Sequence, residues 1–422
     1  FLQAARYGLT EDIMVLTGEK TPIDFLELAL ETAKILRGKM KFIGQDVLVK
    51  QMLYDGRPFE LANSCAITGC NSPSIPGHSL DLPGGMINMP LIFDLALHDG
   101  YSPMLKKQMG PHTGDARNFR SYDQVFDAFK QQFSFFAPYM HLYKNVDKLI
   151  FAQYSPCPLQ SAMMQGCIET ATDITRGAMY PYLSYSMSVS GAPNLGDSLY
   201  AIKRLVFEEK RYTMTQLMDA LDNNFEGYEE LLHQIRLLPK FGNDEPCVDQ
   251  LVNDVLQFVS QEIEKTPGFA GAKSTCAAAT ITGNIPMGAD VGAQPDGRKA
   301  GEPIAEGGIS PHQGRNVSGI TATMASVARL DPMNFRHGSV LNLRIDPEAV
   351  KDSNKIKKLA VLVKTFHAMG GYLVQFNIVS TDMLRDAQKH PEEYKDLLVR
   401  VSTYSAYFVE LSETLQNDII AR

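Results

Sequence analysis

Apolar residues recur at helical spacing in several long segments, which predict a largely helical protein. In residues 21–38, Thr21 supplies an N-cap, Pro22 and Asp24 suit the first turn, and Gly38 ends the apolar run. The same spacing predicts helices over residues 46–54, 246–265 and 354–369. It also predicts long helical material over residues 121–150, interrupted near Pro138.

Strict alternation of apolar and polar residues predicts two short strands, residues 339–345 and 372–379. Four polar side chains stand among their apolar ones: Asn342, Arg344, Gln375 and Asn377. Central strands flanked by helices are usually apolar on both faces. These polar side chains are therefore expected to face either solvent, on an edge strand, or the polar interior of a barrel.

Residues 283–316 are rich in glycine and proline but keep apolar positions such as Ile285, Val291 and Ile304. A long segment of this kind inside a compact domain is usually functional or disordered, and disorder would predict fewer apolar residues. We expect an ordered, functional loop. The chain shows no internal repeat and no clear linker, so it is expected to form one continuous domain.

The composition is that of a globular protein, with 44% hydrophobic and 21% charged residues among 422. The net charge of −8 argues against a nucleic-acid partner. No apolar stretch approaches the roughly 18 residues that cross a bilayer. The first residues, Phe1 to Arg6, lack both an initiator Met and a signal-peptide pattern. We expect a fragment of a longer cytoplasmic chain.

Six cysteines are scattered without a C-x-x-C pair, which argues against a zinc ribbon or an iron–sulfur cluster, and reduced thiols are expected. The nine histidines show no ligand spacing. No phosphate-binding loop, zinc-protease or serine-hydrolase motif is present, and the glycines near Gly283 do not follow the dinucleotide pattern. No bound metal or cofactor is expected.

Two cysteines could carry chemistry. Cys70 lies in Thr-Gly-Cys-Asn-Ser-Pro-Ser-Ile-Pro-Gly, residues 68–77, after a helical run over residues 59–67, so its thiol is expected on a tight loop. A structural role for a lone loop cysteine is the alternative. Cys167 lies in an apolar run, residues 159–175, that is expected to be helical, which favours a core cysteine.

Five segments, in order, resemble the glycyl radical enzymes of the pyruvate formate-lyase-like family. They are the Cys70 loop, residues 197–207, the Gly- and Pro-rich residues 286–303, residues 374–379, and the tail Val-Arg-Val-Ser-Thr-Tyr-Ser-Ala-Tyr-Phe, residues 399–408. The resemblance runs from about residue 40 to the end. Family members are considerably longer, so it covers their C-terminal half.

The resemblance implies an α/β fold, part of a ten-stranded barrel of two antiparallel half-barrels surrounded by helices. Residues 1–300 would belong to the barrel domain and residues 301–422 to a glycine-radical-type domain. In the family, an activating enzyme with an iron–sulfur cluster and S-adenosylmethionine generates a glycyl radical. That radical takes hydrogen from a cysteine, and the resulting thiyl radical attacks substrate. By position, Cys70 matches the thiyl cysteine, and Thr403 stands where the radical glycine is expected.

Threonine is β-branched, so Thr403 is not expected to store the radical. Three explanations stay open: the chain is inactive and serves as a scaffold, a separate small subunit supplies the glycine, or the substitution was engineered or is an error. A homodimer is also compatible with the resemblance. No nucleic acid or membrane partner is expected beside the activating enzyme and a small-molecule substrate.

The Cys70 loop also bears on the reaction. Family dehydratases and C–N or C–S lyases usually carry a glutamate two residues after the cysteine, where this chain has Ser72. We therefore expect radical carbon–carbon bond cleavage or formation, with a dehydratase or C–N/C–S lyase as the alternative. Substrate-binding candidates are Ser72, Asn342, Arg344, Gln375 and Asn377. Arginine is suited to a bidentate contact with a carboxylate.

Overall fold

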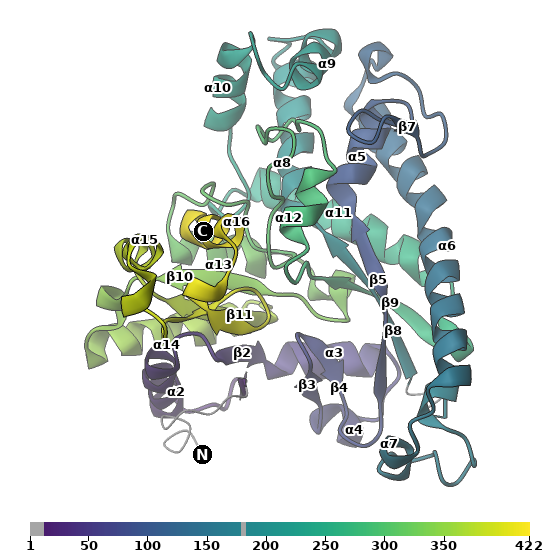
Figure 1. The fold of residues 1–422 in the computed structure, drawn as a ribbon, viewed down its shortest axis with the longest axis vertical. Helices are drawn as coiled ribbons and strands as arrows, with labels where there is room; N and C mark the ends of the chain where they lie inside the picture. The colour runs from purple at the N-terminus through teal and green to yellow at the C-terminus, as the bar shows by residue number, and fades with distance from the viewer. Residues whose placement is uncertain (1–11, 179–182) are drawn as a thin grey trace.

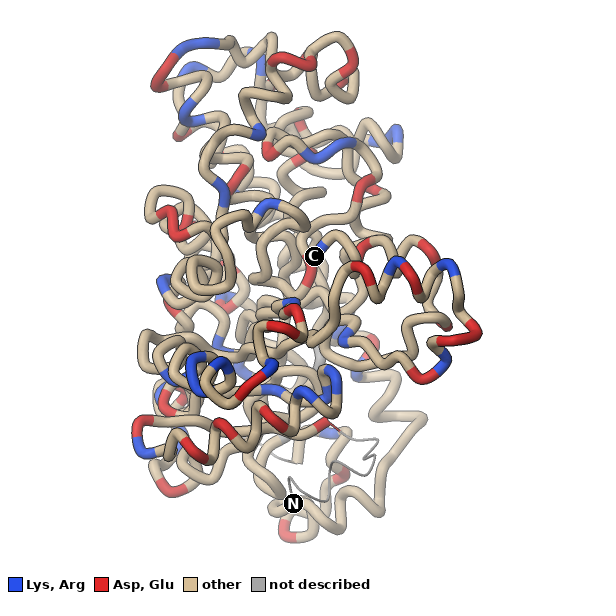
Figure 2. The backbone as a smooth tube through the Cα atoms, turned by 90° about the vertical axis from the view of Figure 1, so that its left-hand side faces the viewer, with Lys and Arg blue, Asp and Glu red and all other residues tan. Residues whose placement is uncertain are grey.

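The computed structural model describes residues 12–178 and 183–422, which form an α/β fold with helices packed around several sheets (Figure 1). Residues 1–6, for which the sequence predicts no signal peptide, lie outside the described residues. None of the described helices combines the length and apolar character needed to cross a membrane. Basic and acidic positions are interspersed along the backbone in Figure 2.

The strands form two larger sheets. The first is mixed, in the order β1 (Ile13–Thr17), β2 (Met40–Gly44), β11 (Leu373–Ile378) and β10 (Leu341–Ile345), with only the β2–β11 pair antiparallel. The second is parallel, in the order β5 (Leu80–Asn88), β8 (Leu183–Ser190) and β9 (Lys273–Ala278). Single bridges, Ala278 to Ser339 and Gly308 to Val340, connect the end of β9 and the 283–316 segment to the start of β10.

Three two-stranded pairs complete the strands: β3 (Ala66–Thr68) with β4 (Ser72–Ser74), β6 (Tyr101–Ser102) with β7 (Lys107–Gln108), and β12 (Leu398–Arg400) with β13 (Ser405–Tyr407). None of the described sheets closes on itself. The α/β class is thus confirmed, whereas the expectation that the chain forms part of a ten-stranded barrel stays a prediction.

The helices lie mainly on the outside of these sheets (Figure 1). They are α2 (Ile23–Leu36), α3 (Gln45–Tyr54), α4 (Phe59–Asn63), α5 (Met89–Leu97), α6 (Tyr122–Tyr154), α7 (Pro158–Ala162), α8 (Ala192–Ile202), α9 (Met214–Asp222), α10 (Glu229–Leu237), α11 (Pro246–Glu264), α12 (Asn284–Ala289), α13 (Ile320–Ala328), α14 (Ser353–Ala368), α15 (Thr381–Lys389) and α16 (Glu413–Ala421).

The predictions for α2, α3, α11, α14 and both strands are confirmed to within two residues at each end. Three helix predictions are wrong in part. Helix α6 continues through Pro138, because its buried face packs on α5, β5 and α11. The helix from residue 59 ends at Asn63 and is followed by β3. The helix predicted over residues 159–175 ends at Ala162, and turns follow.

The apolar core has two parts. The larger one runs through both main sheets and their helices. The smaller one belongs to the C-terminal tail and consists of Val379, Leu384, Ala387, Leu397, Val399, Val401, Phe408 and Ile419. The tail therefore has a small core of its own, and its polar contacts with the rest of the molecule are described below.

Candidate active site

Cys70 lies at the tip of a short hairpin formed by β3 and β4, which we call the cysteine hairpin (residues 66–74). Thr68 pairs with Ser72, leaving Gly69, Cys70 and Asn71 to make the turn. Gly69 has φ +56°, a left-handed conformation that glycine adopts readily. The expectation of a thiol on a tight loop is confirmed, although a strand rather than a helix leads into it.

A second hairpin, formed by β12 and β13, faces the first; we call it the tail hairpin (residues 398–407). Arg400 pairs with Ser405, and the Val401 amide donates to the Tyr404 carbonyl at 3.0 Å, so Ser402 and Thr403 form the tip. Thr403 is only 4% exposed. Its Oγ1 donates a hydrogen bond to Cys70 Sγ at 3.0 Å.

The tail hairpin is held from the first sheet. Gln375 Nε2 donates to the Ser402 carbonyl and to Asn342 Oδ1. Asn377 on the same strand bonds to the main chain of Arg400 in both directions, at 3.3 and 3.4 Å. Both side chains are buried on an inner strand, so they do not face solvent. They hold the tail in position next to Cys70.

Arg400 is a buried cation within the tail hairpin. Its Nε donates to the Ser402 carbonyl at 3.1 Å, and its Nη2 donates to the Thr403 carbonyl at 2.5 Å. Its guanidinium also pairs with both oxygens of Asp12, at 2.8 and 2.9 Å. This fork geometry suits arginine and fixes the turn backbone.

Lys41 on β2 holds the cysteine hairpin. Its Nζ donates to the carbonyls of Gly69 and Cys70 at 3.2 and 3.0 Å and pairs with Asp12 at 3.1 Å. Burial and the nearby Arg400 lower the pKa of Lys41. Burial alone would raise the pKa of Asp12, but Arg400 and Lys41 together hold it below its ordinary value.

A cavity of about 520 Å³ adjoins Cys70. Most of its lining side chains carry hydroxyl or amide groups, and none of the described ones is charged: Thr68, Asn71, Ser72, Ser74, Ser79, Gln160, Ser186 and Ser188, together with Gly69, Cys70, Gly77, Met164, Ala279 and Ile281. Cys70 thus lies between the tail hairpin and the cavity. A hydrogen atom could pass from the cavity to the sulfur and on to position 403.

The five substrate-binding candidates therefore lie in different parts of the structure. Ser72 lines the cavity, and Gln375 and Asn377 contact the tail hairpin. Asn342, on the edge strand β10, donates to Glu306 at 2.5 Å. Arg344 donates to the Ile420 carbonyl in α16 at 2.8 Å, and burial lowers its pKa.

The remaining cysteines are outside this site. Cys167 is 3% exposed, which confirms a buried position, but it lies in a turn rather than a helix. Burial raises the pKa of the Cys65 thiol to about 11 and also raises that of Cys276.

Sequence reasoning missed Asp12 and Lys41. Asp12 is 388 positions from Arg400, and a lone acid or a lysine within a strand gives no local signal of a site. Arg400 lies in the tail motif and could have been singled out there.

Comparison with known proteins identifies the family of the chain. A family model described as "Pyruvate formate lyase-like" matches residues 11–288, and one described as "Glycine radical" matches residues 305–409. The trans-4-hydroxy-L-proline dehydratase of Clostridioides difficile is 36% identical over 405 residues, covering 96% of this chain and 51% of that protein. An isethionate sulfite-lyase of Bilophila wadsworthia is 32% identical, covering 97% and 50%.

Solved structures are also similar. Hydroxyproline dehydratase from Clostridioides difficile with its substrate bound matches with a TM-score of 0.95 at 35% identity, covering all of this chain and 53% of that one. The B12-independent glycerol dehydratase from Clostridium butyricum matches with a TM-score of 0.93 at 33% identity, covering 97% and 52%. The chain spans about half the length of the relatives it matches. The two matched domains and these relatives show that the chain belongs to the pyruvate formate lyase-like family of glycyl radical enzymes.

Proposed function

We propose that the protein containing this chain carries out thiyl-radical chemistry on a small organic substrate, with Cys70 as the residue that exchanges hydrogen with substrate. The contact of 3.0 Å between Thr403 Oγ1 and Cys70 Sγ carries the proposal, because it brings the radical-storage position of the family against the sulfur. The cavity on the other side of Cys70 is the proposed substrate site.

When position 403 is a glycine, each hydrogen transfer breaks one bond to hydrogen and forms another. The Cα radical of that glycine takes the hydrogen atom of the Cys70 thiol, which forms a C–H bond and leaves a thiyl radical. The thiyl radical takes a hydrogen atom from a substrate carbon and returns one to the product radical. S–H and activated C–H bonds are of comparable strength, so each transfer is nearly reversible.

Thr403 does not fit the storage role. A glycyl radical is planar and delocalised over the flanking amides, and the branched Cβ of threonine crowds that arrangement. With Thr403 in place, the chain is either an inactive homologue or one that takes its glycine from a separate subunit, unless the residue was engineered or is an error.

For the reaction, we favour cleavage or formation of a carbon–carbon bond. Ser72 occupies the position two residues after Cys70, and no carboxylate is found among the described side chains that line the cavity, so no base for dehydration is supplied there. The second candidate is a dehydratase or C–N/C–S lyase. The names of the relatives, which include a hydroxyproline dehydratase and an isethionate sulfite-lyase, favour it.

The proposal includes further partners. A radical activating enzyme with an iron–sulfur cluster and S-adenosylmethionine would be needed, and the remaining polypeptide would complete a ten-stranded barrel. Residues 1–300 would contribute to that barrel and residues 301–422 to the glycine-radical domain. A cytoplasmic location and a homodimer are part of the same proposal.

Electron paramagnetic resonance of the full-length protein tests it. After anaerobic treatment with an activating enzyme, the Thr403→Gly variant should give a glycyl doublet, and the unmodified protein should give none. The double variant Thr403→Gly, Cys70→Ala should keep the doublet but lose hydrogen exchange with substrate. Absence of a doublet from Thr403→Gly, or turnover without Cys70, would overturn the proposal.

Activated Thr403→Gly protein also distinguishes the reactions, because its products from candidate substrates show whether a C–C or a C–O, C–N or C–S bond is broken. A signal in unmodified protein that appears only when a small glycine-bearing subunit is added would identify the separate-subunit arrangement.

A further inference from the structure

The two hairpins that meet at Cys70 share one carboxylate. Asp12 pairs with Arg400 in the tail hairpin and with Lys41, which binds the cysteine hairpin. Arg400 and Lys41 side chains are 1% and 2% exposed, and that of Asp12 is 22% exposed. We call these three side chains the ion triplet.

Each cation of the ion triplet binds the backbone of one hairpin at its tip. Arg400 donates hydrogen bonds to the carbonyls of Ser402 and Thr403, and Lys41 donates to those of Gly69 and Cys70. The residues that touch at 3.0 Å, Thr403 and Cys70, are among those whose carbonyls are bound. A shift of either cation therefore moves the contact itself.

The charges explain why Asp12 is needed. Two buried cations repel each other in a medium of low dielectric. The carboxylate between them attracts both cations and so offsets that repulsion. Without Asp12 the two cations, and with them the two hairpin tips, would be driven apart.

We propose that Asp12, Arg400 and Lys41 act as positioning residues that hold position 403 against the sulfur of Cys70. The inference rests on the proposed function for its biological meaning, but the distance between the two hairpin tips can be measured without any radical. Asp12 is the central member because it contacts both cations.

Disulfide trapping in the full-length protein measures that distance. In a Thr403→Cys background, the thiol at position 403 and the Cys70 thiol reduce glutathione disulfide to two glutathiones and form a disulfide, quantified by mapping the linked peptides. The equilibrium constant for this exchange reports how closely the hairpin tips are held.

Asp12→Asn and Lys41→Met, each added to Thr403→Cys, should lower the equilibrium constant by roughly tenfold or more. Asp12→Glu keeps the charge and should restore most of it. The double change Asp12→Asn with Lys41→Met should lose less than the product of the two single losses, because both act through one contact network. Matched controls are Asp127→Asn, an exposed acid on α6, and Lys50→Met, an exposed lysine on α3; neither should change the constant.

A purely structural role would lower thermal stability without changing disulfide formation in the folded protein. Equilibrium constants that stay within about twofold of the parent in folded Asp12→Asn and Lys41→Met variants would overturn the inference. If Asp12→Asn does not fold, the equilibrium constant of Lys41→Met alone decides the test. Lys41→Met removes one cation, whereas Asp12→Asn leaves two buried cations without a counter-ion. Failure of the Thr403→Gly protein to form a radical would overturn the proposed function and leave this measurement unaffected.

Discussion

At the scale of single residues, the cysteine hairpin packs against a glycine, at a position where a side chain would not fit. Gly338 has φ +96°, and a Cβ there would lie 2.1 Å from the Asn71 carbonyl oxygen. That same oxygen accepts a hydrogen bond from the buried Tyr372 hydroxyl at 2.7 Å. The turn next to Cys70 is thus fixed on one side by close packing and on the other by a hydrogen bond.

Gly338→Ala should therefore destabilise the protein and displace the cysteine hairpin. The matched control is Gly227→Ala, because Gly227 has φ +78° but open space around its Cβ position. The control should lose about 1–2 kcal/mol of unfolding free energy from the left-handed backbone alone, and Gly338→Ala should lose clearly more. Chemical denaturation measures both. Equal losses would show that the hairpin yields to the added methyl without cost.

His98, at the C-terminal end of α5, carries a pH dependence of stability. Burial lowers its pKa, but hydrogen bonds and charges from Asp222 and Asp94 outweigh burial and raise the pKa to about 10. Its Nε2 lies 3.0 Å from Asp222 Oδ1, and its Nδ1 lies 2.8 Å from the Asp94 carbonyl. Both ring nitrogens therefore donate, as an imidazolium requires.

Because the folded pKa of His98 exceeds its unfolded value of about 6.5, its contribution to stability is complete below about pH 6.5. That contribution is lost as the pH rises through 10. The free energy of unfolding should fall across this range, and His98→Gln should remove this part of the slope. His233→Gln on the exposed side of α10 is the control. A slope unchanged in His98→Gln would contradict the assignment.

At the scale of elements, α6 shows both the reach and the limit of sequence patterns. Its apolar spacing over residues 121–150 is a local feature, and it predicted the helix. Continuation through Pro138 was not predicted, because packing against α5 and α11 offsets the missing hydrogen bond. The helix predicted from Phe59 to residue 67 was too long for a similar reason. Residues 66–68 pair with residues 72–74, and this strand pairing overrode the helical pattern.

Pro138→Ala should stabilise α6. Pro138 is exposed within the helix, so alanine adds a backbone hydrogen bond and a better helix former without disturbing the core. The free energy of unfolding should rise by roughly 1–3 kcal/mol. In the control, Pro246→Ala at the first position of α11, no gain is expected, since proline suits that position. Destabilisation by Pro138→Ala would mean that the helix needs a bend at this point.

At the scale of the whole molecule, the sequence predicted which loops matter but not what joins them. The family resemblance brought Cys70 and Thr403 together, and the structure adds their contact of 3.0 Å. The ion triplet was not predictable, because Asp12 and Arg400 are 388 positions apart and no periodicity links them. The strand pattern left open whether Arg344 and Asn342 face solvent or a barrel interior, and their described partners are the Ile420 carbonyl in α16 and Glu306. A strand pattern locates a polar side chain on a strand without identifying what that side chain binds.

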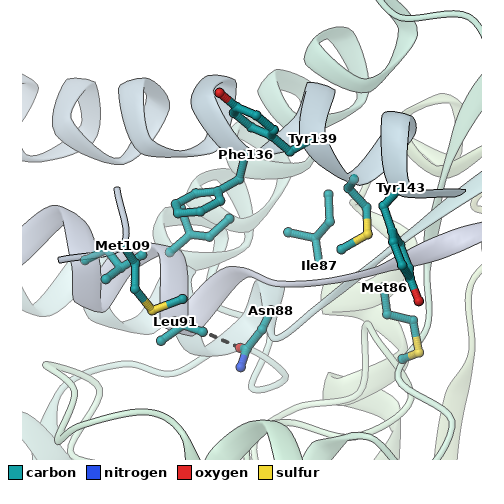
Figure 3. Close-up of a pocket in the computed structure, with 11 residues that line it drawn as sticks. Met86, Ile87, Asn88, Leu91, Met109, Phe136, Tyr139 and Tyr143 are labelled. Atoms are coloured by element: carbon teal, nitrogen blue, oxygen red, sulfur yellow. Dashed lines mark hydrogen bonds between the residues drawn. The ribbon is translucent and has the colours of Figure 1, made fainter. Parts of the chain in front are cut away.

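The outer side of α6 carries an apolar strip. Leu142, Val146 and Leu149 are 62%, 46% and 57% exposed at helical spacing, and further exposed residues extend the strip: Tyr139, Tyr143, Ile150, Phe151 and Tyr154. Tyr139 and Tyr143 also line an apolar cavity of about 350 Å³ between α5, α6 and β5. Figure 3 shows both side chains among the residues that line it. An exposed patch of this kind favours association.

We therefore expect residues 1–422, expressed alone, to self-associate through this strip. The triple variant Leu142→Gln, Val146→Gln, Leu149→Gln should shift the isolated chain toward monomer in sedimentation velocity without lowering its unfolding free energy, because the substituted side chains are exposed. The control replaces three exposed apolar residues from separate segments of the chain outside α6, Leu237, Val317 and Met369, by glutamine; it should leave association unchanged. If both triple variants reduce association equally, general surface hydrophobicity rather than the α6 strip drives it. A monomeric parent chain would show that the strip does not bind to itself.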